Sequence, residues 1–162
     1  MKNKKFDFWI IITIIAILID QVVKVIISRE LVDCIISIIP NVLNLTYVQN
    51  TGAAFGIGNN STSMFIIVNV IVIGLIVYFI FSKKEEISKA ILVSLHLIIA
   101  GGISNLIDRI IHGYVIDFID FYIFNYNYPV FNLADSFICI GILMLLYSIY
   151  LGEDNENSSK WR

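Results

Sequence analysis

Four long apolar runs constrain the fold of this chain more than any other feature of its sequence. They cover residues 8–27, 64–81, 90–107 and 137–151. A helix needs about 20 residues to cross a bilayer, and extending the last run to 132–151 supplies them and brings Asp135 to the membrane edge. Hydrophobic residues make up 58% of the chain and charged residues only 15%, against about 25% charged residues in soluble domains. The sequence therefore predicts a single integral membrane domain, residues 1–162.

The positions of lysine and arginine predict the orientation of the four spans. Eight of the 11 lysines and arginines lie at the two ends of the chain or in the link between the second and third spans. Because positive residues concentrate on the cytoplasmic side, we expect both termini in the cytoplasm and residues 28–63 and 108–131 outside. The first run is too long for a typical signal-peptide core and no A-x-A-like site follows it, so we expect an uncleaved first helix. The polar tail, residues 152–162, is predicted to be disordered.

The two outer segments carry strand patterns rather than further spans. The stretch VLNLTYVQN, residues 42–50, alternates well enough for a strand, and the small residues of TGAAFG, 51–56, permit a tight turn. Residues 108–131 include a second strand-like stretch rich in Tyr and Phe, which suit the membrane interface. We therefore predict a mainly α fold of four transmembrane helices with a small extracytoplasmic β-sheet platform and a loop.

Polar residues inside the spans cluster toward their outer ends. Asp20 and Lys24 are four residues apart, in the order that favours an ion pair on one helix face. This pair could tie the helix to the outer segments or take part in chemistry. In the third span, Asn105, Asp108 and Arg109 also share one face. We interpret this second set as a scaffold around a site.

Small and amide residues in the spans predict how the helices meet. Gly101 and Gly102 would allow a neighbouring helix to approach the third span closely. Asn69, in the second span, is predicted to form a hydrogen bond between helices.

Two carboxylates at similar depth could form a catalytic pair. One is Asp135, and the other is Asp117 or Asp120, between which the spacing does not choose. Like charges a few ångströms apart cannot both stay ionised, so such a pair shares one proton. The ionised carboxylate could then take a proton from water while the protonated one polarises an amide carbonyl. Hydrolysis by this route needs no covalent intermediate.

Other catalytic chemistries have little support in the sequence. His96 and His112 show no metal-ligand spacing, and the two cysteines form no Cys/His cluster. Ser104 and Ser136 have no base at a fixed offset, and Cys139 is better explained by packing. We expect neither a metal nor another cofactor, and no nucleic-acid partner.

Five short motifs together resemble the lipoprotein signal peptidases, the bacterial signal peptidase II family of membrane aspartyl peptidases. They are DQVVK at 20–24, QNTGAAFG at 49–56, GGISNLIDR at 101–109, VIDF at 115–118 and FNLADS at 131–136. Their order and spacing match the family over nearly the whole chain. One position departs from the pattern, because Ser104 stands where the family usually has Gly.

The resemblance implies both a reaction and a set of site residues. Enzymes of this family cut the signal peptide from a prolipoprotein immediately before a diacylglyceryl-modified cysteine, at the outer leaflet of the bacterial cell membrane. The family's two catalytic aspartates fall on Asp117 and Asp135. Supporting or substrate-binding roles fall on Asp20, Lys24, Asn50, Gly52, Asn105, Asp108, Arg109, Asn132 and Ala134. The cyclic peptide globomycin is expected to occupy the same pocket, and a monomer in contact with membrane lipid suffices for activity.

A proton- or cation-coupled transporter subunit is the alternative function. Its carboxylates would line an ion path, and charged residues near the bilayer midplane and repeated halves are typical of such proteins. Here the charged residues of the spans lie toward one side and no repeat is visible. The sequence therefore favours the peptidase.

Overall fold

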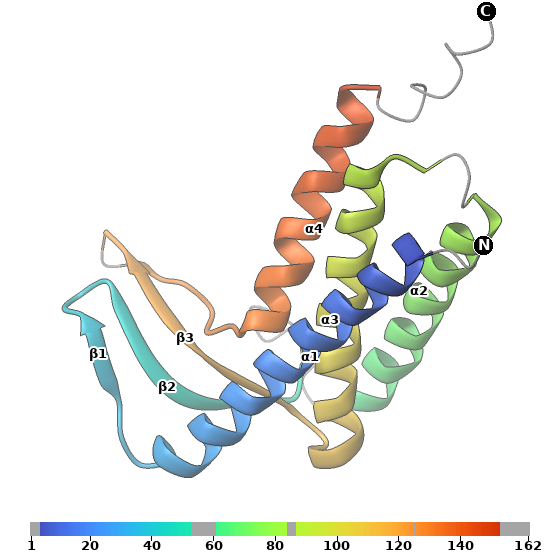
Figure 1. Cartoon of the computed structure of the whole chain (residues 1–162). Helices are drawn as coiled ribbons and strands as arrows, with labels where there is room; N and C mark the ends of the chain where they lie inside the picture. The colour runs from blue at the N-terminus through green and yellow to red at the C-terminus, as the bar shows by residue number, and fades with distance from the viewer. Residues whose placement is uncertain (1–3, 53–60, 84–86, 125, 153–162) are drawn as a thin grey trace, which may run out of the picture.

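Four long helices and a small antiparallel sheet make up the structure, a computed structural model that describes residues 4–52, 61–83, 87–124 and 126–152 (Figure 1). The predicted mainly helical fold with a small sheet is confirmed. In chain order the elements are α1 (Lys4–Glu30), β1 (Ile36–Ile39), β2 (Leu43–Asn50), α2 (Thr62–Ser82), α3 (Lys89–His112), β3 (Val115–Ile123), β4 (Tyr126–Asn127) and α4 (Leu133–Tyr150). Most of the predicted turn at 51–56 and of the predicted disordered tail lies outside the described residues.

All four helices are long and apolar enough to cross a membrane. Their apolar side chains point outward: on α2, Ile71 is 55% exposed and Leu75 is 62% exposed. Such surfaces are expected of helices whose solvent is lipid. Helices α1, α2 and α3 extend past the predicted apolar runs, because polar residues at their ends continue the helical turns, whereas α4 lies within the predicted span 132–151.

Helix α3 occupies the centre of the bundle and packs against α1, α2 and α4. Ser88 caps its start, accepting a hydrogen bond from the Ile91 backbone N–H. Gly113 ends the helix with a φ of 82°, a left-handed conformation that glycine adopts without strain. The chain then turns directly into β3, which brings that strand beside the polar end of α3.

Close helix contacts occur at the glycines of α3 and α4. A Cβ at Gly101 would collide with the backbone carbonyl of Ala134, at the start of α4. A Cβ at Gly141 would lie 2.8 Å from the carbonyl oxygen of Ser94. The predicted hydrogen bond from Asn69 joins α2 to α3, since its Nδ2 donates to the carbonyl of Gly102 at 2.9 Å. The predicted close approach at the α3 glycines is confirmed.

The sheet lies at the end of the bundle where α1 and α3 finish and α4 begins (Figure 1). Its strands follow the order β1-β2-β3-β4 and are antiparallel. Ile116 and Phe118 of β3 pack with Ile27 and Leu31, at the end of α1. This apolar cluster fixes β3 against the helices and so sets the position of Asp117.

Candidate active site

A buried polar network joins the sheet to the ends of α1, α3 and α4. It contains all the site residues named from the sequence: Asp20, Lys24, Asn50, Gly52, Asn105, Asp108, Arg109, Asp117, Asn132, Ala134 and Asp135. These residues come from five different elements and the turn after β2. The fold therefore gathers residues that are more than a hundred positions apart in the sequence.

Lys24 is the cation at the centre of this network, and its side chain is 1% exposed. Its Nζ lies 2.7 Å from Asp20 Oδ2 and 2.8 Å from Asp108 Oδ2. It also donates a hydrogen bond of 3.0 Å to Asn105 Oδ1. The ion pair predicted within α1 is therefore present, and it extends to α3. The sequence left open whether this pair ties α1 to the outer segments or takes part in chemistry. These contacts favour the first, structural role.

Asp20 connects α1 to the first turn of α4. Its Oδ1 accepts a hydrogen bond from the backbone N–H of Ala134 at 3.0 Å. Asp108 makes a similar link to the sheet, because its Oδ2 accepts from the backbone N–H of Ile116 at 3.2 Å. Each carboxylate is thus shared between Lys24 and a backbone donor next to a proposed catalytic residue. Buried charges paired and hydrogen-bonded in this way avoid most of their desolvation penalty.

Asn132 and Asp135 form a capping box at the start of α4. The Asp135 backbone N–H donates to Asn132 Oδ1 at 2.8 Å, and the Asn132 backbone N–H donates to Asp135 Oδ2 at 3.2 Å. This reciprocal pair satisfies two backbone donors that a helix end leaves unpaired. Asp135 Oδ1 accepts a further hydrogen bond of 2.8 Å from Asn105 Nδ2. The carboxylate is therefore held in one orientation.

Asp117, on β3, is 2% exposed and contacts the same asparagine. Its Oδ1 accepts from Asn132 Nδ2 at 2.6 Å and its Oδ2 from Asn50 Nδ2 at 2.8 Å. Burial, and then the negative charge of Asp135, raise the pKa of Asp117 to about 7, although both amide donors and Lys24 act in the opposite direction. Asn132 thus bridges two carboxyl groups that are close enough to repel each other.

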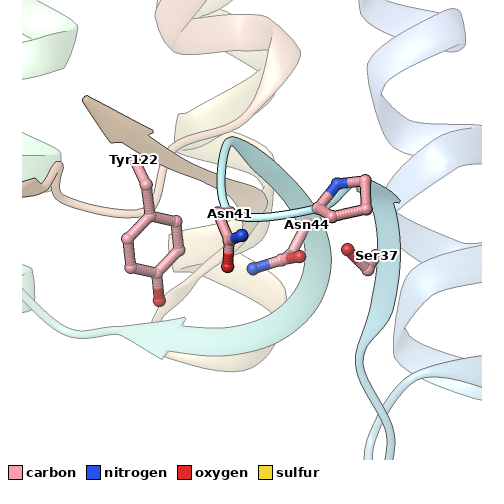
Figure 2. Close-up of a pocket in the computed structure, with 5 residues that line it drawn as sticks. Ser37, Asn41, Asn44 and Tyr122 are labelled. Atoms are coloured by element: carbon pink, nitrogen blue, oxygen red, sulfur yellow. The ribbon is translucent and has the colours of Figure 1, made fainter. Parts of the chain in front are cut away.

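Asp120 lies outside this network. It is also buried, and its Oδ2 accepts a long hydrogen bond of 3.4 Å from Asn44, its partner on β2. Asn44 borders a separate polar hollow of about 420 Å³, which Figure 2 shows on the sheet; it is lined by Ser37, Pro40, Asn41, Asn44 and Tyr122. The structure therefore joins Asp117, and not Asp120, to Asp135 through Asn132.

Arg109 connects α3 to the turn that follows β2. Its guanidinium donates to the carbonyl of Gly52 at 3.2 Å and lies 5.2 Å from the ring centroid of Phe65. The backbone N–H of Gly52 in turn donates to Asn50 Oδ1 at 3.0 Å. Arg109 therefore helps to fix the turn that positions Asn50 over Asp117. Its Nε is buried without a hydrogen-bond partner among the described residues.

Two residues of the network were missed by the sequence-based interpretation. Gln21 Nε2 donates to Asp108 Oδ1 at 2.8 Å and to Ser104 Oγ at 3.0 Å. The Ser104 hydroxyl donates to Asp20 Oδ2 at 2.6 Å. Gln21 stands beside Asp20 in the DQVVK motif, and an N-x-x-D spacing at 132–135 is a capping-box pattern. The role of Gln21 could have been suspected from its neighbour Asp20, and the capping box from the spacing of Asn132 and Asp135. The role of Ser104 depends on how the helices pack and could not be predicted in this way.

No cluster of three or more His, Cys, Asp or Glu side chains able to hold a metal occurs in the described parts of the chain. The chemical resources of the site are two neighbouring carboxyl groups, one of which titrates near neutral pH, and several N–H donors. Such a pair can move protons to and from a bound substrate.

Comparisons with known proteins agree with this fold. Two solved structures superpose with TM-scores of 0.80 and 0.79, at 36% and 35% sequence identity, covering 93% and 88% of this chain and 91% and 92% of theirs. Both are described as bacterial membrane enzymes. The fold is thus that of a multi-pass bacterial membrane enzyme.

The family model for signal peptidase (SPase) II matches residues 12–151. A lipoprotein signal peptidase of Staphylococcus carnosus is 39% identical over 151 residues, covering 92% of this chain and 94% of the relative. The Staphylococcus aureus protein of the same name is 36% identical over 152 residues, covering 93% of each. The chain belongs to the signal peptidase II family and is a protease.

Proposed function

We propose that this membrane protease removes the signal peptide from diacylglyceryl-modified prolipoproteins as an aspartic endopeptidase, cutting before the lipidated cysteine. Asp117 and Asp135 are the catalytic residues in this proposal. The observation that carries it is the bridge made by Asn132, which hydrogen-bonds both carboxylates and so brings them to one site. The names of the similar proteins support prolipoprotein as the substrate.

Because the two aspartates share one proton, one is protonated and the other ionised, and they take different roles. The ionised carboxylate takes a proton from a water molecule, whose oxygen attacks the carbonyl carbon of the scissile amide. The protonated carboxyl donates its proton to the carbonyl oxygen, which carries the developing negative charge. Collapse of the tetrahedral intermediate breaks the C–N bond, and the proton first taken from water passes to the leaving amine. The aspartate that had donated its proton takes one back from a hydroxyl group of the intermediate, which becomes the new carboxyl group. A pKa near 7 for Asp117 suits a group that must carry a proton at neutral pH.

The remaining network residues position the pair in this proposal. Three asparagines donate hydrogen bonds to the carboxylates: Asn50, Asn105 and Asn132. Lys24 pairs with Asp20 and Asp108. These two aspartates in turn anchor the start of α4 and the start of β3. Arg109 and Gly52 fix the turn that carries Asn50.

The position of the site suits a lipidated substrate. The network lies at the sheet end of the helices, where we place the outer leaflet, with both termini in the cytoplasm. A diacylated cysteine could then stay in the lipid while its peptide bond reaches the two aspartates. One chain supplies both carboxylates, so a monomer suffices, and a globomycin-type inhibitor would compete for the same space.

A gel-shift cleavage assay tests the proposal. Purified protein in detergent is given a diacylated prolipoprotein or its unlipidated form, beside the variants Asp117→Asn, Asp135→Asn and Asp120→Asn. We expect cleavage of the lipidated substrate by the parent and by Asp120→Asn, and a loss of at least about 10²–10⁴-fold in rate for the other two variants. Full activity in a folded Asp117→Asn or Asp135→Asn protein would exclude the aspartate mechanism. Equal inactivity of all proteins would direct attention to ion flux in vesicles, as expected of a transporter.

A further inference from the structure

Three asparagines around the carboxylates are each held in one orientation by a group that can only donate a hydrogen bond. Asn105 Oδ1 accepts a hydrogen bond from the ammonium group of Lys24. Asn132 Oδ1 accepts one from the backbone N–H of Asp135, and Asn50 Oδ1 accepts one from the backbone N–H of Gly52. An atom that faces a pure donor must be the amide oxygen. The orientation of each side-chain amide is therefore fixed by the donor that it faces.

With their oxygens occupied, the three amides present their NH₂ groups to the carboxylates. Asn132 and Asn50 donate to the two oxygens of Asp117, at 2.6 and 2.8 Å. Asn105 donates to Asp135 Oδ1 at 2.8 Å, and the Asn132 backbone N–H donates to Asp135 Oδ2 at 3.2 Å. Each of the four carboxyl oxygens thus receives one N–H donor. Hydrogen bonds of this kind favour the charged form of a carboxylate.

Ionised side chains near the pair contribute no net charge. The neighbours are Asp20 and Lys24 from α1 and Asp108 and Arg109 from α3. Two positive and two negative charges cancel, and β2 contributes only the neutral Asn50 beside Asp117. Within the described residues, the groups that offset the cost of burying a charge on the pair are therefore Lys24, whose charge Asp20 and Asp108 largely balance, and the uncharged amides.

We propose that Asn50, Asn105 and Asn132 are positioning residues that keep one of the two aspartates ionised at neutral pH, so that a general base is available. Without their donated hydrogen bonds, both carboxyl groups would hold protons until a higher pH. The inference rests on the proposed roles of Asp117 and Asp135. It assigns to the asparagines an effect on protonation beyond the packing of the site.

The variant Asn50→Asp tests this effect with a minimal change of shape. The new carboxylate can still accept from Gly52, but it has lost the NH₂ group that faces Asp117 and adds a like charge there. Asn50→Ala removes the same donor without adding charge. The matched control is Asn44→Asp, on the same strand, where an equally half-buried amide faces Asp120 away from the proposed catalytic pair.

The measurement is the pH dependence of kcat/KM for cleavage, which reports groups of the free enzyme. We expect both limbs of the profile to move to higher pH by about one unit for Asn50→Asp, so that the loss is about tenfold greater at pH 6 than at pH 9. Asn50→Ala should move them in the same direction by less. Asn44→Asp should leave the profile where it is in the parent.

Two results would overturn the inference. One is a uniform loss of activity at every pH in folded Asn50→Asp and Asn50→Ala proteins, which a purely structural role predicts. The other is an equal shift in Asn44→Asp, which would reflect added surface charge only. Parallel assays of Asp117→Asn and Asp135→Asn separate this failure from that of the proposed function: if those variants are inactive while the Asn50 profiles stay in place, only the role of the asparagines is wrong.

Discussion

The hydroxyl of Ser104 donates a hydrogen bond of 2.6 Å to Asp20 Oδ2, and both side chains are fully buried. The same hydroxyl accepts from Gln21 Nε2. The serine stands where the resemblance to the family leads one to expect glycine. In this chain it has become part of the link between α1 and α3.

Removing this hydroxyl should destabilise the protein. Ser104→Ala leaves Asp20 Oδ2 with Lys24 as its one remaining partner among the described residues, and loss of a hydrogen bond to a buried charged group costs about 1.5–3 kcal/mol. Ser94→Ala is the control, because Ser94 is equally buried on α3 but its hydroxyl donates to the carbonyl of Ala90 in its own helix. Thermal unfolding in detergent should show a clear decrease in Tm for the first variant and little for the second. Equal Tm values for both would show that the Ser104 hydrogen bond adds no stability.

Packing at Gly101 should be sensitive to a single methyl group. In Gly101→Ala the new Cβ would collide with the Ala134 carbonyl and lie 2.7 Å from Ile138. Overpacking of this kind costs about 1–3 kcal/mol, and the displaced turn of α4 carries Asp135. We expect a lower Tm together with slower cleavage.

The control for this change is Gly74→Ala, since a Cβ at Gly74 would meet no atom within 4 Å. Alanine is the better helix former by about 0.5–1 kcal/mol, so this variant should be as stable as the parent or slightly more stable. A Gly101→Ala protein as active and stable as Gly74→Ala would mean that α3 and α4 can separate at no cost.

Lys24 should be essential to folding through its two carboxylate partners. Lys24→Met leaves Asp20 and Asp108 buried without their cation, and breaking a buried ion pair in this way costs about 3–5 kcal/mol. Arg29→Met removes a positive charge from the exposed end of the same helix and should change stability by less than about 0.5 kcal/mol. Yield and Tm of the purified proteins measure the difference. If adding Asp108→Asn to Lys24→Met restores none of the lost stability, unpaired charge is not the cause.

The raised pKa of Asp117 predicts how stability depends on pH. The folded protein binds this proton more tightly than the unfolded chain, so the group's contribution to stability is complete below the ordinary aspartate pKa of 3.8 and is lost as pH rises through about 7. Asp117→Asn carries no charge to bury at any pH. The Tm of the variant minus that of the parent should therefore increase between pH 5 and pH 8. A constant difference would mean that Asp117 titrates at its ordinary pKa when folded.

The sequence predicts the helices and the sheet because both depend on local patterns. Long apolar runs specify α1 to α4, and the alternation at 42–50 specifies β2. The pairing of β2 with β3 could not be predicted from a local pattern, because it joins residues about seventy positions apart in the sequence. Spacing along one chain does not encode such pairings.

The same limit applies to the site. An i,i+4 spacing predicts the pair formed by Asp20 and Lys24, but that lysine also binds Asp108 of another helix. Likewise, the residues alone did not choose between Asp117 and Asp120, because both lie on one strand and only three-dimensional packing brings the first to Asn132. The resemblance to the family supplied what local spacing could not.

The capping box at the start of α4 has a consequence for resistance to drugs. Asn132 and Asp135 close the first turn of α4 and, in the proposed mechanism, also stand at the carboxyl groups that an active-site inhibitor would contact. A substitution that weakens the grip of an inhibitor on either residue also removes a backbone hydrogen bond of the helix. Resistance that arises at these two positions should therefore come with a less stable start of α4.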